Sequence, residues 1–432
     1  MTGDDRSTVL SALSALAEVR FEKRECMLNR TTRHELNLES GQIGLFRTTE
    51  DVSLKMSGII EQRKGSVALN KIVQPAIEAA AEEAMDVARV SDPDDAHDIS
   101  SETSKGAFSR GPAREELDLM HLRLSDFREH VAAEYPSVLL RRGTLSFVRE
   151  EVHYMNSNGV DLSSRTGNYT FSPIFAAKDG RKTSSFNYLS FSSEDLELPL
   201  TDYGNVEELI RQSTEQVEPT VFEGRFVGDL IISPECLHHM LMAVCMYLED
   251  GMMVRGTSIF RDSLDRPVAA SSLTLASRPL SDELASGYFI TEDGFRAADT
   301  TVIERGILKN FLLGLYGSRK TGMPRALTGG GCYVIEPGEA ELEEMISSVD
   351  KGLLLNRFSG GRPSESGDFS GVAKNSYYIE HGRVRYPVSE IMVSGNVQGL
   401  LNNVNAISRQ RTNLGFCFLP WIRVHGFKVF GK

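Results

Sequence analysis

The stretch SGDFSGVAKNSYYIEHGRVRYPVSEIMVSGNV, residues 366–397, contains the turn pattern that sets the architecture of the C-terminal part of the chain. Its centre holds the pair His381-Gly382, and a similar pair, Arg305-Gly306, precedes it. Such pairs suit tight turns because glycine tolerates the positive φ that hairpins require. The last third of the chain is therefore expected to contain antiparallel strands joined by short turns.

The same unit begins near Thr220 and runs to residue 432. Its strand FVGDLIIS leads into a helix that opens at Ser233, a good N-cap, followed by Pro234, which suits the first helical position. Further helices are expected over residues 340–353 and 397–404. Apolar residues recur along the first helix at helical spacing and predict one buried stripe: Leu237, Met240, Leu241, Val244 and Leu248.

Two earlier units precede it. Alternating segments between residues 17 and 65 predict short strands, and residues 68–89 have a helical apolar period. In the central unit, helices near residues 115–134 and 205–216 flank long strands, with turns at Asn158-Gly159 and Asp179-Gly180. Between the units, residues 90–113 are rich in Asp, Ser, Gly and Pro and predict a loop whose acids are solvated.

These patterns predict an α+β protein with mixed antiparallel sheets and packed helices. The expected organisation is an N-terminal α+β domain (1–90), an acidic linker (91–113), a central α+β domain (114–219) and a C-terminal domain (220–432).

Composition narrows the functional class. The chain has 432 residues, of which 41% are hydrophobic and 25% charged, as in a globular protein. Its formal charge of −13 argues against nucleic-acid binding as a main task. No apolar run approaches the roughly 18–20 residues of a membrane span. Five scattered cysteines without a CxxC pair predict free thiols and a cytoplasmic location.

Local motifs for catalysis are weak. The HExxH pattern is absent, and Cys236 with His239 could share a helix face but would need a third zinc ligand from elsewhere. Ser370, two residues after Asp368 in GDFSG, fits a side-chain-stabilised turn better than a catalytic serine. The glycine-rich TGGGC at 328–332 lacks the Walker lysine. A self-contained hydrolase that uses Cys236 or Ser370 is the weakest of the functional hypotheses that the sequence leaves open.

Four C-terminal segments, taken in order, resemble the TldD/PmbA family, once named modulators of DNA gyrase. They are RGTSIFRDSL (255–264), RGILKNFLLGLYGSRKTG (305–322), VIEPGEAELEEMISSVDKGLLL (334–355) and the stretch at 366–397. Earlier in the chain, NSNGVDLSSRTGNY (156–169) is similar to the family in the same order. The resemblance implies a multi-domain architecture and a metallopeptidase built from paired subunits.

The subunit type follows from the helix before RGTSIF, which carries HExxxH in the zinc-bearing TldD type. Alignment on RGTSIF places Leu241 at the first histidine, Met242 at the glutamate and Met246 at the second histidine. None of these side chains offers an imidazole to zinc or a carboxylate base. Cys417 lies near the family's C-terminal cysteine ligand but lacks its glycine-rich context. The chain therefore resembles the metal-free PmbA/TldE type, with no catalytic residue and no metal ligand of its own.

The resemblance implies a non-catalytic subunit of a heterodimeric zinc metallopeptidase that degrades or trims unfolded proteins or precursor peptides. The partner would be a TldD-like chain carrying the zinc, and the subunit alone could form a homodimer. Glycine-rich turns are expected to line the peptide cleft, with Ser359, Gly360, Gly361, Asp368, Ser370 and Gly371 as the candidate residues. The alternative function is a peptide- or protein-binding scaffold without a hydrolytic role.

Overall fold

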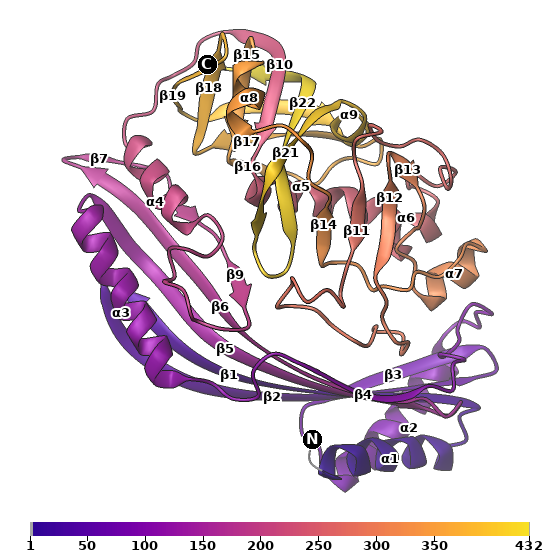
Figure 1. Ribbon diagram of the computed structural model, residues 1–432. Coiled ribbons are helices and arrows are strands. Elements are labelled where there is room, and N and C mark those ends of the chain that lie inside the picture. Colours follow the sequence, from indigo (N-terminus) through magenta and orange to yellow (C-terminus); the bar gives the residue numbers. More distant parts are fainter. Residues whose placement is uncertain (1–2, 432) are drawn as a thin grey trace.

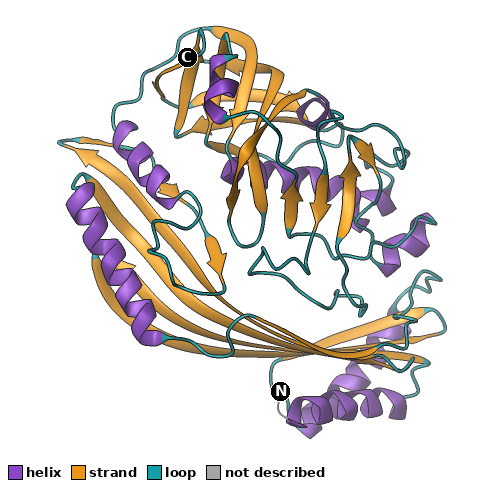
Figure 2. Ribbon diagram, in the orientation of Figure 1, coloured by secondary structure: helices purple, strands orange, loops and turns teal. Residues whose placement is uncertain are grey.

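The computed structural model describes residues 3–431. Long strands and a few helices build the N-terminal half of the chain (Figures 1 and 2). In order these elements are α1 (Gly3–Glu18), β1 (Lys23–Glu39), β2 (Gln42–Ile60), β3 (Arg63–Leu69), α2 (Gln74–Val90), β4 (Lys105–Arg110), α3 (Leu117–Glu134), β5 (Val138–Asn156), β6 (Asp161–Asp179), β7 (Lys182–Thr183), β8 (Asn187–Tyr188), β9 (Phe191–Ser193) and α4 (Val206–Glu215).

The C-terminal half is built from shorter strands and short helices. In order these are β10 (Arg225–Ile232), α5 (Pro234–Cys245), the 3₁₀ turn η1 (Met246–Leu248), α6 (Asp250–Arg255), β11 (Leu275–Ser277), β12 (Thr300–Glu304), β13 (Ile307–Leu308), α7 (Leu315–Thr321), β14 (Tyr333–Ile335), α8 (Leu342–Ser347), β15 (Lys351–Leu355), β16 (Arg357–Gly360), β17 (Asp368–Lys374), β18 (Ser376–Glu380), β19 (Arg383–Val388), β20 (Ile391–Asn396), α9 (Val397–Asn402), β21 (Val404–Asn413) and β22 (Phe418–Phe430).

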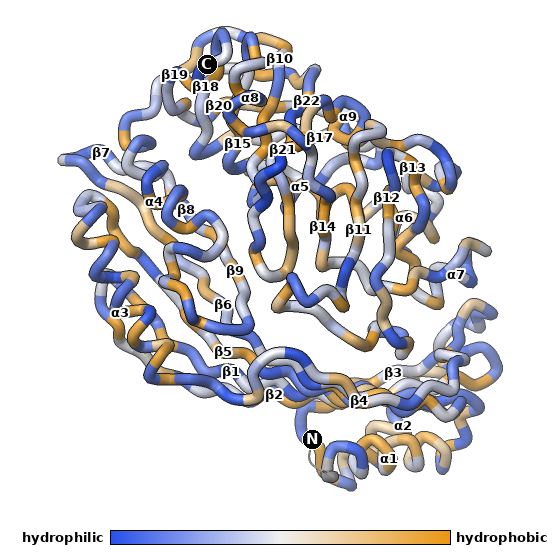
Figure 3. Tube along the Cα trace, in the orientation of Figure 1, coloured by the Kyte–Doolittle hydropathy of each residue, from blue (hydrophilic) through white to orange (hydrophobic). Residues whose placement is uncertain are grey.

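The first sheet has the order β3-β2-β1-β5-β6-β4 and is antiparallel except for the parallel pair β4–β6. Strands β2, β5 and β6 each have 19 residues, so they span roughly 60 Å at the usual rise of a strand. The sheet curves along this length, and the C-terminal half lies over its concave side (Figure 1). Figure 3 shows hydrophilic and hydrophobic positions interleaved along these strands.

The predicted short strands between residues 17 and 65 are in fact two long ones. The polar residues that suggested breaks are part of the alternation, as the pairing of Thr31 with Asp51 in the middle of β1 and β2 shows. A true turn occurs at Ser40 and Gly41, both of which have positive φ. Local composition therefore overstated the number of turns, because an exposed polar residue and a turn residue look alike in sequence.

Helices pack on the first sheet at two places. Helices α1 and α2 enclose a small core with β1 and β2, whereas α3 packs its buried Met120, Leu124 and Phe127 on the far end of β1, β5 and β6. The helices predicted near 115–134 and 205–216 are confirmed as α3 and α4. The predicted helix at 68–89 begins later, at Gln74, because Pro75 occupies its start.

The second sheet belongs wholly to the C-terminal half and has the order β13-β12-β11-β14-β22-β10-β15-β18-β19. Strand β22 also pairs with β20 and β21, and β20 continues to β17 and β16. The predicted turn at His381-Gly382 is confirmed between β18 and β19, and that at Arg305-Gly306 between β12 and β13. The α+β class with mixed sheets is therefore confirmed.

Two expectations need correction. The helix predicted over 340–353 ends at Ser347, since the apolar run at 351–355 is strand β15, buried between β10 and β18. The predicted linker 91–113 contains strand β4, which pairs with β6. The predicted domains 1–90 and 114–219 contribute strands to one sheet, through the β1–β5 pairing. The division into domains stays a prediction.

No helix within residues 3–431 is both long enough and apolar enough to span a bilayer.

Candidate functional site

Helix α5 follows strand β10 as the sequence predicts. Ser233 caps it, with the Ser233 hydroxyl accepting a hydrogen bond of 3.4 Å from the Cys236 amide, and Pro234 opens the first turn. The predicted stripe is confirmed, because Leu237, Met240, Leu241, Val244 and Leu248 are all buried. The helix is anchored in the main core of the C-terminal half, and one of its sides is left to line a pocket.

The three positions aligned with HExxxH do not fit a zinc ion. Leu241 is 2% exposed and lies in the hydrophobic core, whereas its neighbour Met242 is 45% exposed on another side of the helix. Met246 follows the last residue of α5 and begins the 3₁₀ turn η1. None of the three offers an imidazole or a carboxylate, so no metal-dependent step is assigned to them.

The cysteines are poorly suited to chemistry. All five thiols are free and buried. Burial raises the pKa of Cys236 and Cys417 far above the ordinary range, and the charge of Glu235 raises both further. Neutral, enclosed thiols are weak nucleophiles and weak metal ligands. Within residues 3–431, no cluster of three His, Cys, Asp or Glu side chains is arranged to hold a metal ion.

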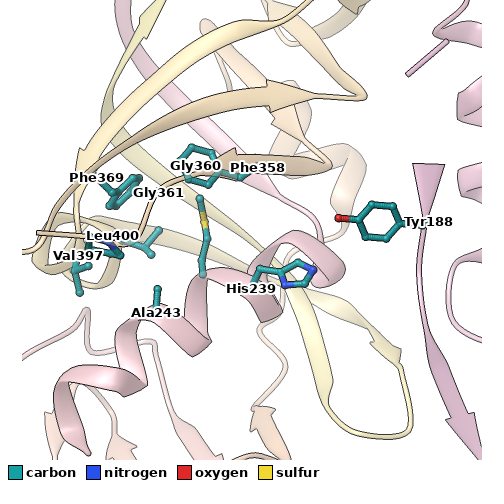
Figure 4. Close-up of a pocket in the computed structure, with 11 residues that line it drawn as sticks. Tyr188, His239, Ala243, Phe358, Gly360, Gly361, Phe369, Val397 and Leu400 are labelled. Atoms are coloured by element: carbon teal, nitrogen blue, oxygen red, sulfur yellow. The ribbon is translucent and has the colours of Figure 1, made fainter. Parts of the chain in front are cut away.

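A pocket of about 260 Å³ lies beside α5 (Figure 4). Helix α5 forms one side, strand β16 and the loop after it form another, β17 and α9 close the far end, and Tyr188 of β8 faces it from the N-terminal half. The lining residues are Tyr188, His239, Met240, Ala243, Phe358, Gly360, Gly361, Pro363, Phe369, Val397 and Leu400. The pocket is therefore assembled from five separate segments of the chain.

The predicted cleft residues divide into two groups. Gly360 and Gly361 line the pocket. Strand β16 pairs with β17, so that Ser359 faces Val372 and Gly360 faces Gly371, but Ser359 and Gly371 lie outside the lining.

Asp368 and Ser370 also lie outside the lining, on exposed positions of β17. The carboxylate of Asp368 accepts hydrogen bonds from the Ser366 hydroxyl at 2.7 Å and from the Asn396 amide at 2.9 Å. These two bonds lower the pKa of Asp368. The carboxylate is thus part of the turn that begins β17, which agrees with a structural role for the GDFSG segment.

Gly360 and Gly371 have a packing role that the sequence did not reveal. The ring of Phe358 lies over both, and a Cβ on either glycine would come within 2.5 Å of this ring. Phe358 in turn meets Phe369 edge-on, with ring centroids 5.7 Å apart. At Gly361 no atom lies within 4 Å of the place a Cβ would occupy. Of the glycines that line the pocket, Gly361 can therefore be enlarged without disturbing the aromatic wall.

Tyr188 and His239 supply the polar groups of the lining. The Arg357 guanidinium lies 3.6 Å from the centroid of the Tyr188 ring and donates a 2.6 Å hydrogen bond to the Phe186 carbonyl. These contacts hold β8 against β16. Although His239 is exposed as a residue, the loss of water around its imidazole lowers its pKa, and the charge of Arg357 lowers the pKa further. The lowered pKa favours the neutral form of the His239 imidazole at neutral pH.

The aromatic wall and Tyr188 were not predicted. Phe358 and Phe369 look like ordinary core residues in sequence, and Tyr188 is 170 positions from Phe358, so no local pattern could join them. Among the lining residues only His239 gave a signal in the sequence, where it was interpreted together with Cys236 as a weak zinc pair. The structure separates Cys236, which is 2% exposed, from the exposed His239.

Comparisons with known proteins agree with the ordered motifs. Residues 225–431 match the family model described as the PmbA/TldA metallopeptidase C-terminal domain. The chain is 24% identical to a metalloprotease PmbA homolog of Haemophilus influenzae, over 88% of this chain and 86% of the relative. It is 23% identical to metalloprotease PmbA of Escherichia coli O157:H7, over 96% and 95% of the two chains.

The fold as a whole is similar to the crystal structure of TldE from Thermococcus kodakarensis. The TM-score is 0.82 at 18% identity, and the match covers 98% of this chain and all of the other. Sequence motifs, the C-terminal family model and relatives aligned over nearly the full length lead to one conclusion: the chain belongs to the TldD/PmbA family.

Proposed function

We propose that this chain is the non-catalytic, PmbA/TldE-type subunit of a two-chain zinc metallopeptidase that degrades or trims unfolded proteins or precursor peptides. The observation that carries the proposal is the chemistry at the positions aligned with HExxxH, which are Leu241 and Met242 in α5 and Met246 at the start of η1. The relatives named metalloprotease PmbA and the likeness to TldE support it.

In this proposal a TldD-like partner carries the zinc, which when bound polarises the scissile carbonyl and activates water. The present chain contributes the walls of a shared peptide cleft. Its pocket beside α5 offers apolar surface, and β16 offers main-chain groups at the rim. An extended, unfolded segment can use both kinds of contact, whereas a folded substrate has its main-chain groups already paired. The cleft would thus select for unfolded substrates.

The test is co-expression with a TldD-like chain that contains HExxxH. The two chains should purify together, the complex should hold zinc, and an unstructured peptide should be cleaved in a chelator-sensitive manner. The present chain alone should hold no stoichiometric zinc and cleave nothing. Met242→Ala in this chain serves as a control and should leave turnover unchanged, because an exposed thioether performs no step of hydrolysis.

Two results would contradict the proposal. One tightly bound zinc in the isolated chain, with chelator-sensitive peptidase activity, would make it a catalytic subunit. A chain that binds peptides as a homodimer, and gives no hydrolysis with any HExxxH-containing partner, would instead be the peptide-binding scaffold.

A further inference from the structure

The pocket beside α5 has the size of a single side chain. Its volume of about 260 Å³ is below the roughly 300–1,000 Å³ of pockets that enclose whole small-molecule ligands. Phe358 and Phe369 form an edge-to-face aromatic wall, and Met240 on the opposite side is 6% exposed. The pocket can therefore enclose one bulky side chain while the rest of a ligand stays outside.

The charge of the pocket selects the kind of side chain. None of the lining residues is Asp, Glu, Lys or Arg, and the lowered pKa of His239 keeps its imidazole neutral at pH 7. A charged side chain would lose its hydration here. The charge that acts on His239, the Arg357 guanidinium stacked on Tyr188, already donates a hydrogen bond to the Phe186 carbonyl. Leucine, methionine or phenylalanine side chains would instead exchange water for contact with Phe358, Phe369 and Leu400. The complementary ligand is neutral and apolar.

The rim of the pocket suits an extended main chain. Among the described strands, β16 pairs with β17 alone, so its other edge is not part of a sheet. Gly360 and Gly361 at the end of this strand have no side chains to hold a neighbouring backbone away. Addition of a peptide strand to such an edge uses main-chain hydrogen bonds and leaves specificity to side-chain pockets.

We propose that the pocket formed by α5, β16, β17 and α9 is a specificity subsite that binds one bulky apolar side chain of an extended peptide. The peptide nature of the ligand rests on the proposed function. The subsite lies entirely within this chain, so the non-catalytic subunit would choose which residue of the substrate is held, while cleavage takes place in the partner.

The test uses the full chain alone and five blocked, fluorescent peptides that differ at one central residue between serine–glycine arms. The central residue is glycine, leucine, phenylalanine, lysine or glutamate. Burial of a leucine or phenylalanine side chain should strengthen binding about ten- to hundredfold relative to glycine. Lysine and glutamate should bind no better than glycine. Fluorescence anisotropy gives the five dissociation constants.

Two variants fill the pocket. Ala243→Phe places a ring in it from α5, and Gly361→Leu fills it from the rim, where no atom lies within 4 Å of a Cβ. Both should abolish the preference for leucine and phenylalanine and leave the weak binding of the glycine peptide. Ala79→Phe, at an exposed position of α2, is the matched control and should keep the preference.

Equal affinity for all five peptides, or a preference that survives in both filled variants, would overturn the subsite. Because binding is measured without a partner or zinc, a failure of two-chain hydrolysis would overturn the proposed function and leave the subsite intact. Conversely, the two-chain enzyme could cleave all five peptides at the same rate and be unaffected by Ala243→Phe. This result would support the proposed function and contradict the subsite.

Discussion

His238 is a partly buried imidazole with an incomplete set of contacts. Its ring centroid lies 5.0 Å from that of Phe416 and 5.6 Å from that of His239. Its Nδ1 atom has no hydrogen-bond partner among the described residues. Burial and, to a smaller extent, the charge of the neighbouring His239 together lower the pKa of His238 to about 4. The folded chain therefore favours the neutral ring.

The expected consequence is a loss of stability in acid. In the unfolded chain the imidazole takes up a proton near pH 6.5, but the folded chain resists protonation until about pH 4, so the free energy of unfolding falls as the pH drops through this window. The contribution lost is about 3 kcal/mol. His238→Phe keeps the ring contact and removes the titration and the unpaired Nδ1. The variant should be at least as stable at pH 7, with an advantage that grows toward pH 4.

Urea denaturation from pH 7.5 to 4 measures this difference. His121→Phe, at an exposed position of α3, controls for the loss of an imidazole elsewhere. A stability difference between His238→Phe and the natural chain that does not change with pH would show that His238 is not kept neutral by the fold.

At the scale of elements, the acidic loop after α2 is a docking segment for α7. Asp94 lies 2.9 Å from the ammonium of Lys320, and Asp98 lies 2.6 Å from both the Arg319 guanidinium and the Lys23 ammonium. The sequence predicted solvated acids here, because the cations that pair with them are distant in the chain. The physical role of the loop is to join the start of β1 to a helix of the C-terminal half.

Asp98→Asn should lower the free energy of unfolding by about 1–2 kcal/mol at low ionic strength and by less at high salt. Burial raises the pKa of Asp98, but the hydrogen bonds from Lys23 and the Ile99 amide outweigh this effect and lower it overall. In the natural chain the stabilisation is therefore present above pH 3.8 and is lost as the pH falls through the lowered pKa.

Asp95→Asn is the matched control, since Asp95 is exposed and only its main-chain carbonyl accepts a hydrogen bond from Arg319. Denaturation in 20 mM and 500 mM salt compares the two variants. Equal stability of both variants at low salt would mean that the Asp98 ion pairs contribute nothing to the docking of α7.

At the scale of the whole molecule, strand β4 joins the two halves through one buried cation. The Arg110 side chain is 9% exposed and donates to the carbonyls of Pro279 at 3.0 Å and Leu280 at 2.6 Å. Its guanidinium also lies 5.3 Å from the centroid of the Phe289 ring. The first sheet is thus fixed to the C-terminal half at Arg110, in addition to the contact between Tyr188 and Arg357. The pocket depends on this relative placement, because Tyr188 of its lining comes from the N-terminal half.

Arg110→Met should lower the free energy of unfolding by about 2–4 kcal/mol, because it leaves buried carbonyls without donors. Urea denaturation monitored by fluorescence and limited proteolysis at the segment 278–289 measure the effect. Arg89→Met is the matched control, because Arg89 is exposed on α2 and pairs with Asp86 alone. A loss no greater than in this control would show that Arg110 does not hold the halves together.

The local sequence was sufficient for features whose cause lies within a few residues. The cap at Ser233, the buried stripe of α5 and the turns at Arg305-Gly306 and His381-Gly382 follow from hydrogen-bonding capacity, side-chain period and backbone freedom. The order of the C-terminal motifs also revealed the family resemblance. The alignment on these motifs showed that Leu241, Met242 and Met246 offer neither an imidazole nor a carboxylate.

The pocket could not be predicted in the same way. It exists because Tyr188, α5, β16 and α9 lie together in the packed structure. Contacts between residues so distant in the chain produce no periodic pattern in the sequence. The same reason explains Gly360 and Gly371, which were interpreted as open turn residues but accommodate the ring of Phe358. Residue type limited the chemistry of this chain, whereas long-range packing placed its apolar pocket.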